Sequence, residues 1–297
     1  MDVPAFAKLD RLLPWLLRLL WVVVLVTGGS AVDGATADVG GSVAETARYG
    51  ALLVWIAGVV AMAVPAVVSL TAVRVIVPAT VPVAVVTLTA GTETMRGVLF
   101  LAVGLVSTML VLSADLGRVY VQASAYGEED RHLLRPPAAY AIASIVTWSI
   151  CVALLIVGPL ATADGRWITG LSSTVAGVGI TALGWPRWHR LARRWFVVVP
   201  VGVVIHDQLV LAETIMLRRQ DLARIRLAPV GTDAADLTGP AAGHAVEIST
   251  VEITTAIFAA TPKQPQGNAI HLRACLIAPT RPGRALRAAA TRRLPVG

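Results

Sequence analysis

Charged residues are scarce in this chain, and their scarcity weighs against an ordinary soluble enzyme. Only 14% of the 297 residues are charged and 56% are hydrophobic, with a mean hydropathy of +0.72. Soluble globular domains carry about 25% charged residues. Residues 1–185 hold ten basic and eleven acidic residues, whereas residues 186–297 hold fifteen basic and seven acidic residues. The sequence therefore predicts a membrane protein with a basic C-terminal domain.

Cysteine is also rare, which limits the chemistry that the chain can support. Cys151 and Cys275 are the two cysteines, so neither a disulfide framework nor a Cys-x-x-Cys metal site is possible, and two buried free thiols are expected. No apolar segment carries the series of Asp, Glu or His residues that a proton relay needs. No acidic pair in the outer loops has the spacing of a metal-dependent transferase. These features lower the expectation of a transporter or an enzyme, and no cofactor or metal is expected.

Six apolar segments are long enough to cross a bilayer, which requires about 20 residues per helix. They lie within an expected transmembrane domain of residues 1–186 and cover residues 12–32, 49–71, 74–91, 97–114, 137–161 and 168–184, each bound being approximate. Arg74 is the one charged residue in residues 50–90, and we expect it in the inner turn of a helical hairpin. Four spans remain possible if residues 72–96 do not cross.

The distribution of basic residues predicts the orientation. With the N-terminus in the cytoplasm, eleven basic residues flank the spans on the inner side, and Arg48, Arg96 and Arg166 lie outside. Cytoplasmic loops of membrane proteins are enriched in Lys and Arg. We therefore expect a multi-pass protein of the cell inner (plasma) membrane with both termini in the cytoplasm.

The last span and the longest inner connection each carry a recognisable pattern. Ser173, Gly177 and Thr181 recur every four residues and predict a small-residue ridge for helix packing; a substrate-lining face is the alternative. Residues 115–137 include a charged cluster with His132, which we expect to be a solvated loop that contacts the C-terminal domain or a partner. A metal site at His132 is not expected, because no second His or Cys lies nearby.

A basic juxtamembrane linker is expected at residues 187–194. It contains Arg187, Arg190, Arg193 and Arg194. Each cation close to an anionic leaflet contributes about 1 kcal/mol. These four arginines are therefore candidate contacts for anionic membrane lipid or for a protein partner.

Residues 195–297 show the short apolar runs and turn signals of a mainly-β domain. The expected strands are residues 195–199, 203–206, 209–217, 222–227, 245–249, 251–258 and 269–277, with a loop at Pro262–Asn268 and a terminal helix at Pro282–Leu294. His206-Asp207 is interpreted as a turn rather than a catalytic or metal-binding pair. A second set of candidate lipid or partner contacts is formed by Arg218, Arg219, Arg224 and Arg226.

Parts of this domain resemble bacterial pleckstrin-homology-like (PH-like) domains. Gly202–Asp207 resembles the early hairpin of that family, and Thr214–Ile225 resembles its strand–turn–strand. The terminal helix Pro282–Leu294 is also in the expected place, whereas the Gly- and Pro-rich loop at residues 229–243 departs from the pattern. The whole chain is similar to actinobacterial multi-pass membrane proteins with such a tail. The resemblance implies a six-span α-helical membrane bundle followed by a cytoplasmic PH-like domain, and it carries over no catalytic residue.

These features favour a non-enzymatic membrane scaffold or regulatory subunit that docks a membrane or cytoplasmic protein partner. A small-molecule or lipid transporter or flippase is the first alternative and needs a polar cavity between the spans. A membrane enzyme of envelope-lipid synthesis is the second and needs Asp and Glu residues that converge on the outer face. Nucleic-acid binding is not expected, because the strands of this tethered basic domain do not interleave aromatic and basic residues.

Overall fold

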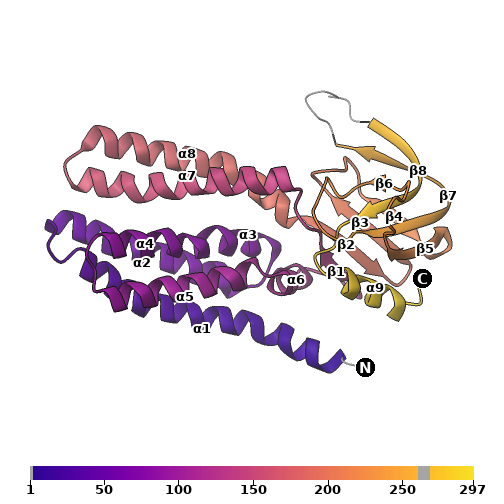
Figure 1. Ribbon diagram of the computed structural model, residues 1–297, viewed down its shortest axis with the longest axis horizontal. Helices are drawn as coiled ribbons and strands as arrows, with labels where there is room; N and C mark the ends of the chain where they lie inside the picture. Colours follow the sequence, from indigo (N-terminus) through magenta and orange to yellow (C-terminus); the bar gives the residue numbers. More distant parts are fainter. Residues whose placement is uncertain (1–2, 260–267) are drawn as a thin grey trace. The chain divides into compact units, whose positions relative to one another are not determined.

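The structure, a computed structural model, describes residues 3–259 and 268–297 and divides into two compact units (Figure 1). The helical unit comprises the residues up to Tyr120 together with Ser144–Arg187. The β-rich unit comprises Val121–Ala143 together with Trp188–Gly297. The expected division at residue 186 is therefore corrected, because residues 121–143 belong with the C-terminal residues. Most of the expected loop Pro262–Asn268 lies outside the described residues.

Among the described residues, six helices are long and apolar enough to cross a membrane, as the sequence predicts. The helices are α1 (Val3–Ala35), α2 (Gly41–Ala63), α3 (Val67–Ile76), the 3₁₀ turn η1 (Val77–Ala79), α4 (Thr80–Thr89), α5 (Thr94–Leu112), α6 (Ala114–Gln122), α7 (Ala138–Ala163) and α8 (Trp167–Ala192). Segments α3, η1 and α4 together form one candidate span of 23 residues, and α6 is too short to be one.

The turn between the second and third spans lies at Val64–Ala66, not at Arg74 as expected. Pro65 explains this position, because the residue before a proline is driven out of the helical conformation. Val64 accordingly has φ −126° and ψ 114°, which is extended backbone. Arg74 therefore lies inside α3, two turns from its start.

Residues 187–192 of the expected juxtamembrane linker are helical, because α8 continues through Pro186 to Ala192. A proline removes one backbone donor from a helix and displaces the carbonyl four residues earlier. Two features accompany Pro186 in α8. Arg187 Nη1 donates to the carbonyl of Leu183, and the last turn carries two basic residues, His189 and Arg190. Arg187 and Arg190 therefore lie on the final turns of a helix, whereas Arg194 begins β2.

Helices α1 and α2 are joined by two reciprocal tryptophan hydrogen bonds. Trp21 Nε1 donates to the carbonyl of Trp55 at 2.9 Å, and Trp55 Nε1 donates to the carbonyl of Trp21 at 2.8 Å. Gly58 makes room for this arrangement, because a Cβ there would overlap the Trp21 ring. Glycine allows the helices to approach closely, and Trp21 becomes almost fully buried.

The described residues of the β-rich unit form two four-stranded sheets and a terminal helix. The first sheet has the order β1 (Asp130–Leu133), β2 (Arg194–Val199), β3 (Gly202–Asp207) and β4 (Ile215–Arg218). The second has the order β5 (Leu222–Leu227), β7 (Val246–Phe258), β8 (Asn268–Ile277) and β6 (Ala235–Asp236). The 3₁₀ turn η2 (Arg219–Asp221) joins β4 to β5, and α9 (Pro282–Thr291) follows β8. A mainly-β domain with a terminal helix is thereby confirmed.

Three strand predictions need correction. Residues 130–133 form β1, so this part of the expected loop is a strand. The expected strand at residues 209–217 shrinks to β4, because the Asp207 carboxylate accepts hydrogen bonds from the backbone N–H groups of Leu209 and Val210 and holds a turn there. The expected strands at 245–249 and 251–258 form one strand, β7, whose pairing shifts register between Ser249 and Thr254.

One apolar core fills the space between the two sheets and α9. It includes Phe196, Val198, Ile205, Leu217, Ile225, Ile248, Ile277, Ala285 and Ala289, all almost fully buried. Backbone hydrogen bonds join the sheets at two corners. Thr280 donates to the carbonyl of Leu133 at 2.8 Å, and Ala212 donates to the carbonyl of Ile257 at 2.9 Å.

Candidate functional site

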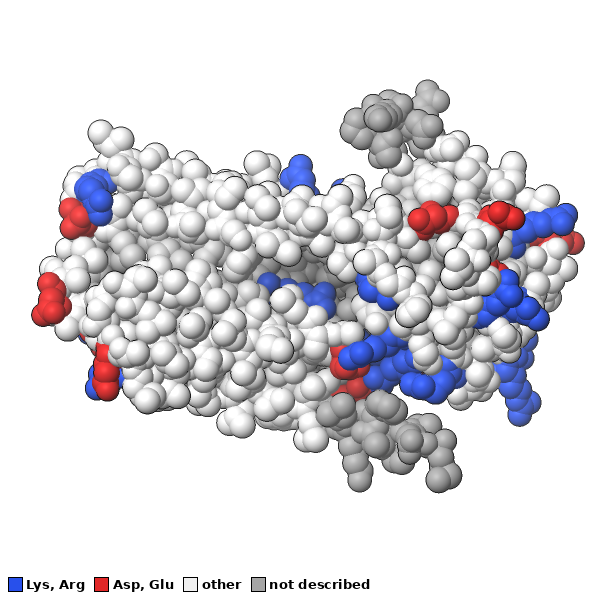
Figure 2. All heavy atoms as spheres, in the orientation of Figure 1, with Lys and Arg blue, Asp and Glu red and all other residues white. Residues whose placement is uncertain are grey.

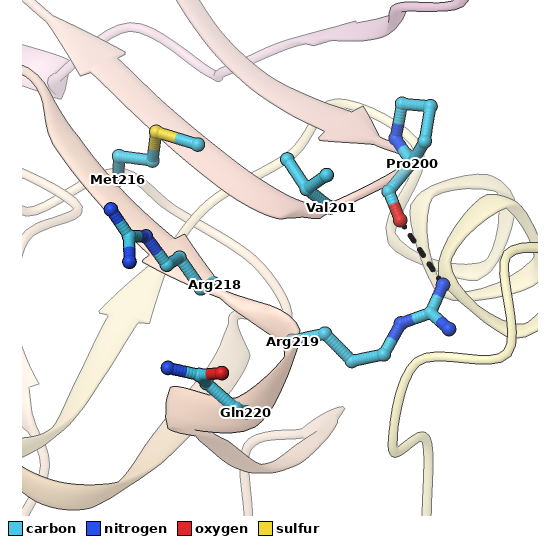
Figure 3. Close-up of a pocket in the computed structure, with 6 residues that line it drawn as sticks. All are labelled: Pro200, Val201, Met216, Arg218, Arg219 and Gln220. Atoms are coloured by element: carbon cyan, nitrogen blue, oxygen red, sulfur yellow. Dashed lines mark hydrogen bonds between the residues drawn. The ribbon is translucent and has the colours of Figure 1, made fainter.

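A shallow hollow opens on the first sheet where the β2–β3 turn lies beside β4 (Figure 3). It is lined by Pro200, Val201, Met216, Arg218, Arg219 and Gln220. Val201 and Met216 give it an apolar surface and are 57% and 53% exposed. The β2–β3 turn ends at Gly202, which has φ +155°, and a Cβ there would collide with the carbonyl of Leu217 on β4. Only glycine therefore lets the turn lie this close to β4.

The two arginines of the hollow differ in how firmly they are held. Arg219 Nη2 donates to the carbonyl of Pro200 at 3.1 Å and to that of Arg292 at 2.9 Å, as the dashed line in Figure 3 shows for the first. The side chain of Arg218 is exposed, and no carboxylate of the described residues forms an ion pair with it. The hollow thus combines an apolar surface with one fixed and one adaptable cation.

The other two arginines predicted with them have different environments. Arg224 is exposed on β5. Arg226 forms an ion pair with Glu247 at 2.8 Å, and Thr232 donates to the second oxygen of that carboxylate at 2.6 Å. Burial raises the pKa of Glu247, but the hydrogen bonds from Thr232 and Arg226 outweigh it and the pKa is lowered. Arg226 therefore stabilises the second sheet and is not a free contact residue.

Arg194 is fully buried, so its predicted role as a lipid or partner contact is wrong. Its Nε and Nη2 donate to the two oxygens of Asp207 at 2.8 and 2.6 Å. The same guanidinium donates to the carbonyls of Arg135 and Thr238. A buried arginine needs this pairing, because an unpaired charge in the interior is very costly. The other three arginines of the expected linker remain accessible: Arg187 and Arg190 are exposed and Arg193 is half-buried.

Figure 2 shows how positive charge is distributed over one face of the molecule. Lys and Arg atoms gather over the β-rich unit, whereas the helical unit is largely uncharged apart from small groups of charges at its ends. Close to the turns that follow α1, α4 and α7, Asp33 pairs with Arg48, Glu93 with Arg96 and Asp164 with Arg166, at 2.9 to 3.0 Å. These carboxylates are each paired with a local arginine and do not form an acidic cluster together.

The predicted ridge on α8 is close to, but not the same as, the one that packs against α7. A Cβ at Gly177 would lie 2.9 Å from the Leu155 side chain, and Thr181 Oγ1 lies 2.8 Å from Cys151 Sγ. The tightest approaches involve Gly158 and Gly170, where a Cβ would lie 2.7 Å from the backbone N of Thr174 and 2.5 Å from that of Thr162. The ridge on α8 therefore consists of Gly170, Thr174, Gly177 and Thr181, and Thr174 takes the place of Ser173.

His206 and Trp195 form a stacked pair on the outer side of the first sheet. Their ring centroids are 4.9 Å apart, and His206 Nδ1 lies 2.9 Å from Thr214 Oγ1. Burial, reinforced by Arg193, lowers the pKa of His206. His132 is buried in β1 with its Nε2 3.4 Å from Asp130. Among residues 3–259 and 268–297, no three His, Cys, Asp or Glu residues are grouped so as to hold a metal ion.

No known protein family, curated protein or solved structure matches this chain. The PH-like resemblance of residues 202–207 and 214–225 therefore stays a prediction. The hollow beside β4 was only partly predicted, because the sequence identified Arg218 and Arg219 but not the surface of Val201 and Met216 beside them. Gly202, between Pro200-Val201 and a predicted strand, was the available sequence signal for a turn that lies close against a neighbouring strand.

Proposed function

We propose that the chain is an integral membrane scaffold or regulatory subunit that recruits an acidic protein segment to the hollow beside β4. The observation that carries this proposal is the combination of an apolar surface, Val201 and Met216, with Arg218 and Arg219. Protein interfaces are enriched in arginine and methionine relative to the rest of the surface. A carboxylate accepts two parallel hydrogen bonds from one guanidinium, which makes an acidic segment the matching ligand.

The state of the two arginines supports binding at this position. Arg219 is already fixed by two carbonyl oxygens, so little side-chain entropy is lost when a ligand binds beside it. Arg218 has no ion pair to break first. The unbranched side chain of Met216 adapts to different apolar partners. The hollow is therefore suited to moderate affinity for an acidic segment that also carries an apolar side chain.

The proposal also includes the insertion of the six helices into a membrane, with both termini in the cytoplasm. Large apolar side chains remain exposed along every candidate span, among them Leu53, Val60, Val106, Ile145 and Val175. Lipid would cover such side chains. Polar residues buried in the bundle, such as Thr80, Thr87 and Thr92, use their hydroxyls to donate to backbone carbonyls. This pattern supports helix packing in preference to a polar transport route.

The topology is tested by cysteine labelling on intact cells. A cysteine at Ala37 should react with an impermeant thiol reagent, whereas a cysteine at Ala234 should react only after permeabilisation. Background labelling should be low, because both natural cysteines are buried and burial raises the pKa of Cys275 to about 12. Labelling of Ala234 but not of Ala37 would overturn the orientation.

The docking site is tested by photo-crosslinking of the full chain in cells. A photoreactive residue at Met216 should form an adduct with one acidic protein, and the charge reversal Arg218→Glu should abolish it. Arg273→Glu is the matched control, because Arg273 is an exposed arginine of β8 outside the hollow, and Val251 on β7 is the control crosslinking position. An adduct that is insensitive to Arg218→Glu, or an adduct with lipid alone, would refute recruitment of a protein.

A further inference from the structure

Two arginines cap helix ends at the same end of the helical unit. Arg18 of α1 donates from Nε and Nη2 to the carbonyl of Met62 at 3.2 and 2.9 Å, and from Nη2 to that of Ala63 at 3.0 Å. These are carbonyls of the last turn of α2, which have no partner within their own helix. A cation at a helix C-terminus also interacts favourably with the helix dipole. Most of the hydrogen-bonding capacity of Arg18 is therefore used within the protein.

Arg74 of α3 is held far more loosely. Its Nε donates to the carbonyl of Val111, in the last turn of α5, over a long distance of 3.4 Å. Because α2 and α5 both run toward this end of the bundle, Arg18 and Arg74 serve helix ends on the same side. An arginine has five N–H donors, so four donors of Arg74, on its two Nη atoms, have no hydrogen bond within the described residues.

The described carboxylates near this end form their ion pairs with other residues than these two arginines. Asp10 of α1 is paired with Arg118 of α6 at 2.8 Å, and both side chains are largely buried. Among the described residues, neither Arg18 nor Arg74 forms an ion pair with a carboxylate. In the part of the chain that the structure describes, Arg18 and Arg74 are therefore two cations held by backbone carbonyls and not by carboxylates.

A charged side chain within a membrane span is costly unless it is paired or reaches the interface. Arg74 lies two turns into a candidate span, and Trp148 Nε1 donates to the carbonyl of the next residue, Val75, at 2.9 Å. Helix α7 thus packs beside Arg74. An anion that approaches through the lipid headgroup layer is the natural partner for the free Nη atoms. A phosphate offers several oxygens, and a guanidinium binds two of them through parallel hydrogen bonds.

We propose that Arg74 binds the phosphate of an anionic phospholipid at this end of the bundle, with Arg18 adding positive potential. The inference rests on the membrane insertion proposed above, but it does not depend on the hollow of the β-rich unit. The lipid would act as a structural ligand that completes the arginine-capped ends of α2 and α5. Free phosphate offers the same chemistry, so the experiment must separate the two sources.

The test uses the purified full chain in a zwitterionic detergent. Its thermal unfolding is followed during titration with phosphatidylglycerol, phosphatidylcholine or inorganic phosphate. A ligand that binds only the folded state raises the melting temperature as its concentration exceeds its dissociation constant. Phosphatidylglycerol should raise the melting temperature, phosphatidylcholine should not, and Arg74→Gln should weaken the apparent affinity about tenfold or more.

Arg11→Gln is the matched control for general attraction between arginines and anionic lipid. Arg11 lies at the start of the first candidate span, seven residues before Arg18 on α1, and is exposed. This variant should respond to phosphatidylglycerol like the natural chain. Arg74→Lys should give an intermediate affinity, because it keeps the charge and loses the paired donors.

Three outcomes decide the proposal. Equal stabilisation of the natural chain and Arg74→Gln by phosphatidylglycerol would overturn it, as would the absence of any stabilisation. If inorganic phosphate raises the melting temperature and phosphatidylglycerol does not, the site binds free phosphate and the proposal of a lipid ligand is overturned. If Arg74→Gln does not fold, native mass spectrometry of the natural chain decides, and a chain that retains no anionic lipid refutes the inference. A chain that fails to enter membranes at all refutes the proposed function instead.

Discussion

Removing Arg194 should destabilise the β-rich unit far more than removing a surface charge. In Arg194→Met, Asp207 would remain buried without the guanidinium that donates to both of its oxygens. Breaking a buried ion pair from one side costs about 3–5 kcal/mol, because the remaining charge is left uncompensated. The carbonyls of Arg135 and Thr238 would lose a donor in the same step.

Hydrogen exchange of β2 and β3 amides in the full chain measures this loss locally. Because about 1.4 kcal/mol corresponds to a factor of ten, these amides should exchange about 100- to 4,000-fold faster in Arg194→Met than in the natural chain. Glu128→Gln is the surface control, since Glu128 is 75% exposed and its pair with Arg292 should contribute about 1 kcal/mol or less. The double variant Arg194→Met with Asp207→Leu should recover part of the loss, because it removes both charges.

Two results would refute this reasoning. If Arg194→Met exchanges no faster than Glu128→Gln, the buried pair does not hold the sheet. If the double variant is as unstable as the sum of the two single variants, the two groups act independently and the ion pair is not the cause.

Three further predictions concern packing, the extent of the β-rich unit and pH. Gly158→Leu should lower the free energy of unfolding in detergent by more than the roughly 1–3 kcal/mol of ordinary overpacking, because the new side chain would overlap the Thr174 backbone. The loss should also exceed that of Gly177→Leu, which meets only side chains. Gly179→Leu is the control, because open space surrounds Gly179, and equal losses in Gly158→Leu and Gly179→Leu would contradict the packing. A fragment of residues 195–297 should not melt cooperatively, because it lacks β1, which pairs with β2. Residues 121–143 joined by a short linker to residues 188–297 should melt cooperatively. A cooperative melt of the shorter fragment would show that β1 is dispensable. Burial and Arg193 lower the pKa of His206 below its ordinary 6.5, so the unfolded chain binds a proton more readily and stability should fall as pH drops below about 6.5; an unchanged pH profile in His206→Gln would exclude this residue as the cause.

The sequence predicted the elements whose signals are local. Six long apolar runs correspond to six long apolar helices in the described part of the chain, because length and hydropathy alone decide that property. Most of the C-terminal strands and the terminal helix were also located within a few residues. The second and third spans were displaced because residues 50–90 are almost uniformly apolar. In such a segment, Pro65 was a better indicator of the turn than Arg74.

The contacts that needed long-range information were missed. Nothing near Arg194 in the sequence distinguishes it from Arg190 or Arg193, yet its partner Asp207 lies directly opposite across the β2–β3 pair. The hydrogen bonds between Trp21 and Trp55 likewise depend on how α1 and α2 are placed. On α8, the spacing of seven residues between Gly170 and Gly177, and between Thr174 and Thr181, was a usable signal that the four-residue pattern obscured.

The most consequential missed element is β1, because it makes the hairpin of α7 and α8 an insertion in the β-rich unit. The chain leaves this unit after Ala143 and returns at Trp188, and β1 and β2 pair across the insertion. The ladder continues without interruption from β1 through β2 and β3 to β4, which carries Met216 and Arg218 of the hollow. A ligand that binds the folded sheet at β4 stabilises every contact that unfolds together with it. Occupation of the hollow should therefore also protect the β1–β2 pairing that closes the insertion, so the proposed partner would stabilise the segment from which α7 and α8, the last two candidate spans, emerge.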